Sequence, residues 1–378
     1  MRYHFPTTII FGSGKISELA QLVKEKLHAS RPFLVTDRGI QEAGIVDKIK
    51  DQLPGIPIFD EVEQNPKHST VNWGGGLARQ LYPDLVIGLG GGSSLDAAKA
   101  IALLAANPGR IEDYEGRERY EVPPVPVLAV PTTCGTGSEV TWVSVITNTS
   151  RKFKMSIKGP EMFPAVALVD PDLLMTLPPP LVASTGLDAL THAVEAYTVK
   201  QANFITDIFA RESLRLIFQH LEDAYLDIKR NKKAREGMMK ASLFAGMAFG
   251  NSDVGAVHCL AEAVGSLYDT PHGVANAVFL PYVMEFNFDV SVARYAEIAQ
   301  IAGIKVKKKE EAARRLIQKI KRLSRTLSIP FLLDLGIAEE DFSAIAQKSF
   351  ENNSNPSNPK LVTAEDYLAI LKKTSREP

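Results

Sequence analysis

The chain has 378 residues, which is long for one hydrophobic core, so two packed domains are expected. Its composition, 45% hydrophobic and 23% charged, is that of an ordinary globular protein. Because 43 Lys and Arg residues nearly balance 44 Asp and Glu residues, the chain lacks the broad basic field that a nucleic-acid-binding or peripheral membrane protein needs.

The first half of the chain alternates short β-rich runs with helical patterns. The runs include residues 8–11, 33–36, 56–59, 85–88, 127–130 and 166–169. Such alternation is typical of a largely parallel sheet that is covered by helices on both faces. We therefore predict a Rossmann-like, doubly wound α/β domain over residues 1–180, whose ligands bind at the carboxyl ends of the strands.

Asp37 follows the β-rich run 33–36 directly. A carboxylate at the tip of a strand accepts hydrogen bonds from both ribose hydroxyls of an adenosine and repels a 2′-phosphate. An ordinary turn residue is the alternative interpretation.

A glycine-rich turn follows the run 85–88. It contains Gly88, Gly90, Gly91 and Gly92, followed by Ser93 and Ser94 and then a helical pattern. Glycines let the backbone approach a phosphate closely, and the N-terminus of the helix attracts an anion. The spacing departs from G-x-G-x-x-G, because Ser93 stands where the third glycine belongs. We predict a nucleotide site here, with a plain tight turn as the alternative. Gly74–Gly76 follows no strand, so it is interpreted as a flexible or closely packed segment.

A second polar turn, Pro131-Thr-Thr-Cys-Gly-Thr-Gly-Ser-Glu139, follows another apolar run. Its hydroxyl groups and glycines suit the phosphates or the nicotinamide of a cofactor. Two such turns at strand ends of one sheet are less easily explained by chance than either turn alone.

Helical patterns dominate after the proline-rich segment 177–180, which marks a domain boundary. They cover residues 184–197, 208–229, 233–250, 257–267, 290–301, 309–327 and 364–372. We predict an all-helical C-terminal domain over residues 181–378.

Three histidines and one aspartate of this half have the spacing of a metal site. Asp188 and His192 lie four residues apart on a predicted helix, which places both on one face. His258 lies on another helix that ends near Gly265, and His272 lies on the turn that follows. One carboxylate with three imidazoles suits Fe²⁺ or Zn²⁺. Buried histidines that merely satisfy their hydrogen bonds are the alternative.

The motifs together resemble the iron-containing alcohol dehydrogenase family, over essentially the whole chain. The matching segments are Gly90–Ser93 with Asp96, 131–139, 169–171, Gly186-Leu-Asp-Ala-Leu-Thr-His-Ala-Val-Glu195, and Pro271-His-Gly273. The resemblance implies a homodimer with its active site between the domains.

The resemblance also implies roles for individual residues. The metal ligands are expected to be Asp188, His192, His258 and His272. The cofactor contacts are expected to be Asp37, Asn65, Gly91, Gly92, Ser93, Thr132, Thr133, Thr136 and Lys154. Phe249 is expected to form a wall of the substrate pocket. Many family members carry a histidine four residues after the third ligand, where this chain has Glu262. Glu262 is therefore a candidate catalytic proton carrier, an additional metal ligand, or an acceptor for the N–H of a ligating histidine. A side chain that turns into solvent or pairs with a nearby lysine is the alternative.

The expected activity is hydride transfer between NAD(H) and a small primary alcohol or aldehyde, with the help of a divalent metal. The metal is expected to be Fe²⁺, with Zn²⁺ as the alternative. A glycerol-dehydrogenase-like polyol enzyme and an NAD-using dehydroquinate-synthase-like lyase are the nearest alternative functions. A hydrolase that uses metal-bound water would leave the glycine turn unexplained.

Two cysteines, Cys134 and Cys259, suit a reducing compartment. The N-terminus does not have the pattern of a signal peptide, and no apolar stretch is long enough to span a membrane. We therefore expect a cytoplasmic protein without nucleic-acid or membrane partners.

Overall fold

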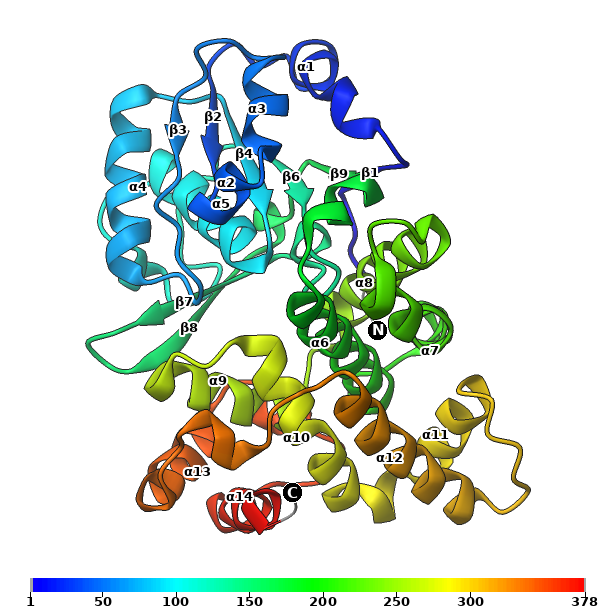
Figure 1. The fold of residues 1–378 in the computed structure, drawn as a ribbon. Coiled ribbons are helices and arrows are strands. Elements are labelled where there is room, and N and C mark those ends of the chain that lie inside the picture. The colour runs from blue at the N-terminus through cyan, green and yellow to red at the C-terminus, as the bar shows by residue number, and fades with distance from the viewer. Residues whose placement is uncertain (1–2, 377–378) are drawn as a thin grey trace. The chain divides into compact units, whose positions relative to one another are not determined.

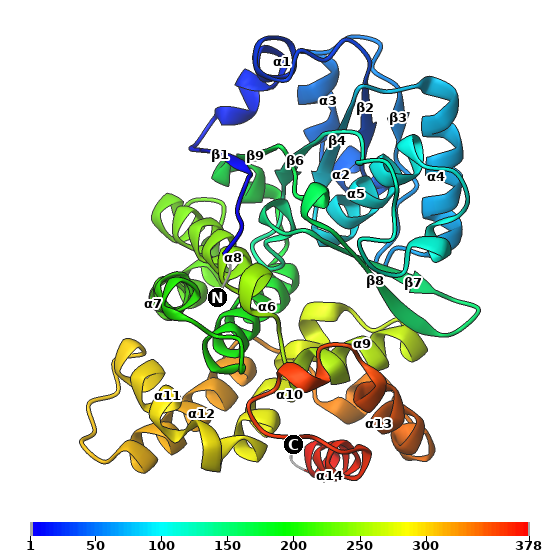
Figure 2. The same ribbon diagram turned by 180° about the vertical axis from the view of Figure 1, so that it is seen from behind.

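The computed structural model describes residues 3–376 and divides them into two compact units. The α/β unit consists of residues 4–133 and 137–177. The helical unit consists of residues 178–376 together with Tyr3 and Cys134–Thr136. Figures 1 and 2 show the elements of each unit from opposite sides. Within the described range, no helix has both the length and the apolarity needed to cross a bilayer.

The α/β unit is built on a parallel sheet, as predicted. Within residues 3–376 this sheet has six strands in the order β1-β9-β6-β4-β2-β3. Their bounds are β1 (Thr8–Phe11), β2 (Pro32–Val35), β3 (Ile58–Phe59), β4 (Leu85–Gly90), β6 (Val127–Pro131) and β9 (Val166–Val169). Strand β4 pairs with β2 on one side and β6 on the other, so the glycine-rich turn lies at the centre of the sheet.

Both faces of this sheet are covered, because successive side chains of a strand point to opposite sides. Phe33 and Val35 pack with helices α4 (His68–Leu81) and α5 (Gly92–Ala106), whereas Leu34 between them packs on the other face. That second face is covered by α1 (Leu19–Gln21) and α3 (Ile45–Lys50) (Figure 1). Each strand therefore has near-continuous apolar sequence, as a sheet buried on two faces requires.

The sequence did not predict a smaller sheet in this unit. Among the described residues it comprises β5 (Gly116–Arg117), β7 (Val143–Asn148) and β8 (Phe153–Lys158), with β7 and β8 antiparallel. Serine, threonine and lysine residues interrupt the two longer strands, so neither has the apolar run that identifies the buried parallel strands.

The interpretation of Gly74–Gly76 as a flexible segment is wrong, and close packing is the correct alternative. The three glycines lie inside α4. A Cβ on Gly74 would come within 2.5 Å of Ile101 Cδ1, and a Cβ on Gly75 within 2.5 Å of Leu104 Cδ1. Gly74 and Gly75 therefore let α4 approach α5 more closely than residues with side chains would allow.

The helical unit contains α6 (Pro179–Thr198), α7 (Phe204–Asp227), α8 (Lys232–Ser252), α9 (Ala256–Tyr268), α10 (His272–Phe286), α11 (Phe288–Ile301), α12 (Lys309–Thr326), α13 (Phe342–Glu351) and α14 (Ala364–Arg376). Helix α6 packs against α7, α8 and α10, and α9 packs against α10 and α13 (Figure 2). The predicted all-helical architecture is confirmed, but α10 and α13 were not predicted. Helix α10 is apolar on most sides and contains Pro281, so it has no polar face to reveal a helical period. His272 consequently begins α10 and does not lie on a turn.

Alanine substitutions in α4 test this packing. Gly75→Ala should lower the free energy of unfolding by about 1–3 kcal/mol, because the added methyl group overlaps Leu104, whose Cβ would lie only 2.7 Å away. At Gly76, no described atom beyond the neighbouring residues and backbone of α4 lies within 4 Å of the Cβ position, so Gly76→Ala should instead raise that free energy by about 0.5–1 kcal/mol. Urea unfolding measures both. Equal effects of the two substitutions would contradict the proposed contact.

Candidate functional site

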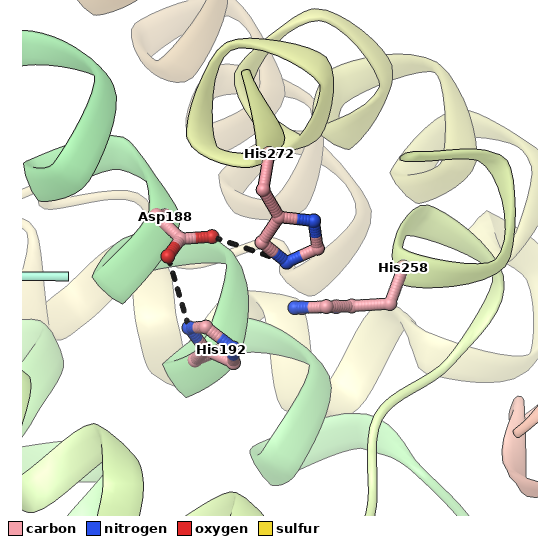
Figure 3. Close-up of side chains that lie close together, drawn as sticks. All are labelled: Asp188, His192, His258 and His272. Carbon is pink, nitrogen blue, oxygen red and sulfur yellow. Dashed lines mark ion pairs between the residues drawn. The ribbon is translucent and has the colours of Figure 1, made fainter. Parts of the chain in front are cut away.

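Four side chains of the helical unit meet at one point. Asp188, His192, His258 and His272 each present one potential ligand atom, and these atoms lie within 4.8 Å of one another (Figure 3). Asp188 and His192 come from α6, His258 from α9 and His272 from α10. The first three are buried and His272 is partly exposed. The sequence-predicted set is therefore brought together in space.

Local geometry explains why these residues converge. The four-residue spacing on α6 brings His192 Nδ1 to 3.8 Å from Asp188 Oδ2. His272 Nε2 lies 3.8 Å from Asp188 Oδ1. A Cβ on Gly273 would lie 2.5 Å from the carbonyl oxygen of Ser184, so glycine lets α10 start directly against α6.

Burial and neighbouring charges affect the histidines of the cluster in different ways. Burial lowers the pKa of His192 to about 4, despite the opposing charge of Asp188, so this imidazole is neutral and keeps a lone pair. Burial also opposes a charge on His258. However, its hydrogen bond to Glu195 and the nearby carboxylates raise the pKa of His258 on balance. The cluster therefore attracts positive charge, as a proton or as a metal ion.

Glu195 is a buried carboxylate beside the cluster whose contacts the sequence did not predict. Its carboxylate accepts hydrogen bonds from the backbone N–H groups of Gly255 (2.9 Å) and Val257 (2.8 Å). It also lies 2.5 Å from His258 Nδ1, which must donate to it, so the Nε2 lone pair of His258 is left for a ligand. Glu195 follows Asp188 by two helical turns and His192 by three residues on α6, and that spacing was the available signal.

Asn276 is a second contact that the sequence did not predict. This buried residue lies four positions after His272 on α10, and its side-chain nitrogen contacts Asp188, His258 and His272.

Phe249 and Glu262 lie in different surroundings. The ring of Phe249 stacks on the imidazole of His192, with centroids 4.2 Å apart and an interplanar angle of 19°. Glu262 is partly buried and accepts a hydrogen bond of 2.6 Å from the Asn352 amide. It does not belong to the described group of four potential ligands, and Glu195 is the residue that accepts the Nδ1–H of His258.

In the α/β unit, most predicted cofactor residues gather at the carboxyl ends of neighbouring strands. Asp37 follows β2, the Gly90–Ser93 turn follows β4, and Thr132 and Thr133 follow β6. Gly90 has φ of 144°, and its Cβ would lie 2.6 Å from Ser94 Oγ, so this turn requires glycine. Helix α5 then begins at Gly92 and directs its N-terminus to this edge.

The carboxylate of Asp37 already has two partners within this edge. Oδ1 accepts a hydrogen bond from the N–H of Ile40 and so caps α2 (Arg38–Glu42), and Oδ2 accepts one of 2.7 Å from Ser94 Oγ. Each carboxylate oxygen has a further lone-pair direction for a ligand hydroxyl.

The other three predicted cofactor residues lie elsewhere. Lys154 on β8 donates a buried hydrogen bond of 2.7 Å to Asn65 Oδ1. Thr136 belongs to the three-residue segment that clusters with the helical unit.

The second polar turn contains a buried carboxyl group, Glu139, that the sequence did not single out. Nearby, Lys99 Nζ lies 3.0 Å from Asp96 Oδ1, and Asp96 accepts a hydrogen bond of 2.5 Å from Ser138 Oγ. Glu139 is 2% exposed, and its Oε1 has no hydrogen-bond partner among residues 3–376. Burial raises its pKa to about 7, and a backbone hydrogen bond and the charge of Lys99 offset only part of that effect.

Substitution of Glu139 should change how stability depends on pH. Neutral Glu139 stabilises the fold below the ordinary pKa of glutamate, and this contribution is lost as pH rises through about 7. Glu139→Gln removes the ionisation. Between pH 5 and pH 8.5, the free energy of unfolding of the wild type should therefore fall by about 3 kcal/mol relative to that of the variant. Chemical unfolding at both pH values measures this difference. The exposed Glu42→Gln serves as the control, and a similar gain in that variant would contradict the assignment.

Comparisons with known proteins agree with this architecture. A sequence profile described as iron-containing alcohol dehydrogenase matches residues 6–171, and one described as the C-terminal part of the Fe-containing alcohol dehydrogenase family matches residues 182–375. An NAD-dependent methanol dehydrogenase of Bacillus methanolicus is 37% identical, with 98% of each chain covered. A 1,3-propanediol dehydrogenase of Citrobacter freundii is 40% identical over 98% of this chain and 97% of the relative.

Solved structures give the same result. A crystal structure of a 1,3-propanediol oxidoreductase superimposes with a TM-score of 0.94 at 40% identity and covers 99% of both chains. An alcohol dehydrogenase from Oenococcus oeni superimposes with a TM-score of 0.92 at 34% identity, covering 99% of this chain and 100% of the other. The chain therefore belongs to the iron-containing alcohol dehydrogenase family, a family of oxidoreductases.

Proposed function

We propose that this chain transfers hydride between NAD(H) and a small primary alcohol or aldehyde, with a divalent metal, Fe²⁺ in the first instance, held by Asp188, His192, His258 and His272. The convergence of one carboxylate and three imidazoles within 4.8 Å carries the proposal.

The donor set fits the metal. Carboxylate oxygen and imidazole nitrogen are ligands for Fe²⁺ and Zn²⁺ alike, so Zn²⁺ remains the alternative. Burial keeps His192 neutral, and Glu195 directs the Nε2 lone pair of His258 into the cluster. When bound, the metal acts as a Lewis acid toward the substrate oxygen and lowers the pKa of an alcohol there.

The remaining residues bind and orient the reactants. The glycine turn and the start of α5 suit the cofactor phosphates, and Asp37 suits the adenosine ribose. Phe249, stacked on His192, supplies an apolar wall beside the ligands. In the oxidative direction, the alcohol carbon gives hydride to the nicotinamide and the hydroxyl proton leaves, which yields an aldehyde and NADH.

A small, neutral substrate is the best supported. The names of the relatives include a methanol dehydrogenase, a 1,3-propanediol dehydrogenase and a lactaldehyde reductase of Escherichia coli, which is 36% identical over 96% of each chain. Glu262 adds a negative charge near His258, which disfavours anionic oxoacids. We further propose a homodimer in the cytoplasm, where the free cysteines Cys134 and Cys259 would stay reduced.

Removal of single ligands tests the metal site. Loss of a residue that only supports a ligand typically weakens metal binding roughly 10- to 100-fold. His258→Ala and His272→Ala should each weaken it by more than this, and turnover should fall with metal content. Elemental analysis and steady-state assays with NADH and aldehydes measure the two effects. His220→Ala, which removes a buried imidazole of α7 outside the cluster, should keep its metal. Full metal content and full turnover in both ligand variants would disprove the assignment.

Glu262→Gln separates a proton-transfer role from a ligand role. If Glu262 carries a proton, turnover should fall while metal content stays constant, whereas loss of a ligand would lower both. Kinetics that are unchanged across the pH range would leave Glu262 with only its structural contact to Asn352.

Cofactor preference depends on Asp37. The wild type should use NADH much more efficiently than NADPH, because a 2′-phosphate beside this carboxylate is repelled. Asp37→Gly and Asp37→Asn should both relax the preference. Asparagine caps a helix about as well as aspartate, so Asp37→Asn should relax the cofactor preference without unfolding α2. The ratio of kcat/KM for the two cofactors is the measurement, and equal use of both by the wild type would refute the role.

A further inference from the structure

We propose that a basic hollow beside α12 binds a small polyanion, a compound with two or more linked phosphate groups. The hollow has a volume of about 520 Å³, and its cationic lining residues are Lys305, Arg315, Lys319 and Arg322. It lies wholly in the helical unit and shares no residue with the proposed metal and cofactor sites. The inference therefore goes beyond the proposed function and does not depend on it.

Two stretches of chain form the hollow. Helices α11 and α12 pack side by side (Figure 1). The segment 303–305, which follows α11, forms one wall, and one face of α12 forms the other. Arg315, Lys319 and Arg322 share that face, because they follow one another at spacings of four and three residues. A hydrogen bond of 2.8 Å from Lys319 Nζ to the carbonyl oxygen of Ala302 joins the two walls.

The charge of the hollow has one sign. Among the described residues, its lining includes four cationic side chains and no acidic one. The whole chain has 43 Lys and Arg residues against 44 Asp and Glu residues, so this concentration of positive charge is local. Like charges three or four residues apart on a helix repel one another. An anion in the hollow would relieve that repulsion.

The partners of the cations distinguish the hollow from an ordinary charged helix face. Arg315 Nη2 lies 2.6 Å from a carboxylate oxygen of Glu311. Within residues 3–376, the side chains of Lys305 and Arg322 form no ion pair or hydrogen bond with the protein. Lys321 is next to Arg322 in the sequence but lies outside the hollow, and its Nζ lies 2.9 Å from a carboxylate oxygen of α10. Two of the four lining cations are therefore available to a ligand.

Linked phosphate groups match this lining. A guanidinium group binds two phosphate oxygens at once, an ammonium group binds as a point charge, and the amide of Gln318 adds neutral donors. Several cations around one hollow favour a ligand with several negative charges, which a single carboxylate does not supply. The volume lies within the roughly 300–1,000 Å³ of small-molecule sites, so a triphosphate fits. Inorganic tripolyphosphate and a nucleoside triphosphate share this chemistry.

Replacement of two lining cations tests the site. Binding of inorganic tripolyphosphate to the full chain is measured by calorimetry at low salt, for the wild type and for the double variant Lys305→Gln/Arg322→Gln. The wild type should bind, and the double variant should bind about tenfold more weakly or worse, because charge-assisted hydrogen bonds are lost. Both side chains are exposed, so the Tm of the variant should match that of the wild type.

The matched control is the double variant Lys307→Gln/Arg325→Gln. It removes the same two types of charge from exposed positions of the same segment, outside the hollow. Its affinity for tripolyphosphate should stay within about twofold of the wild type, because solvent and salt screen charges that do not contact the ligand. An equal loss in both double variants would reduce the effect to net charge and overturn the site. Equal affinity in all three proteins would place the anion elsewhere, and no binding by the wild type would also overturn the proposal.

Two further probes identify the ligand, with the affinity lost in Lys305→Gln/Arg322→Gln as the measure in each case. If ATP binds more tightly than tripolyphosphate, the hollow also contacts the nucleoside, whereas equal affinities assign the linked phosphates alone. Both results support the site. Inorganic monophosphate should bind at least about tenfold more weakly than tripolyphosphate, because it contacts fewer cations. Equal affinity for monophosphate and tripolyphosphate would overturn the preference for linked phosphates.

Discussion

The helical unit depends on the burial of two carboxylates, Asp188 and Glu195, on one face of α6. Both are almost inaccessible to solvent, so each must find donors inside the protein. Glu195 obtains them from Gly255, which precedes α9, and from Val257 in its first turn, and Asp188 obtains one from Asn276 on α10. These hydrogen bonds attach α9 and α10 to α6 at fixed positions. The convergence of His258 and His272 on His192 follows from that attachment.

The α/β unit solves a related problem with its backbone. Strand β4 lies between β2 and β6, and the chain must turn back from its end into α5. Gly90 provides the positive φ that this turn requires. The side chains that border this turn, Asp37 and Ser94, hydrogen-bond to each other. Asp96, one helical turn into α5, accepts hydrogen bonds from Ser138 and from the N–H of Val145. The glycine turn and the second polar turn are therefore linked through side chains and are positioned together.

The sequence predicted those features that leave a local pattern. The parallel strands are uniformly apolar, and Asp188 and His192 combine a helical spacing with residue types that are uncommon in an apolar helix. Features that depend on contacts between distant segments were missed. Glu195 shares the helical spacing of Asp188 and His192, but its hydrogen bonds to α9, like those of Asn276 to the cluster, became recognisable only when α9 and α10 were placed against α6. Glu139 lies in a turn that was predicted to be polar, yet its burial is a property of the packed fold. The hairpin of β7 and β8 was missed because its strands mix polar and apolar residues.

The charge of the cluster provides an argument for a divalent ion that is independent of ligand spacing. Asp188 and Glu195 together bring two negative charges into a buried site whose other members are imidazoles, and His192 is kept neutral by burial. Buried charge of one sign is costly, and the donors around the carboxylates reduce that cost without removing the charge. A dication balances the two carboxylates, whereas a single proton on His258 balances only one. Glu262 is more exposed, and its carboxylate accepts a hydrogen bond from the amide of Asn352. The charge of Glu262 therefore requires no such compensation. The amide of Asn276 donates to Asp188, the carboxylate of the pair that has fewer backbone donors, so side-chain and backbone donors together offset the two charges only in part.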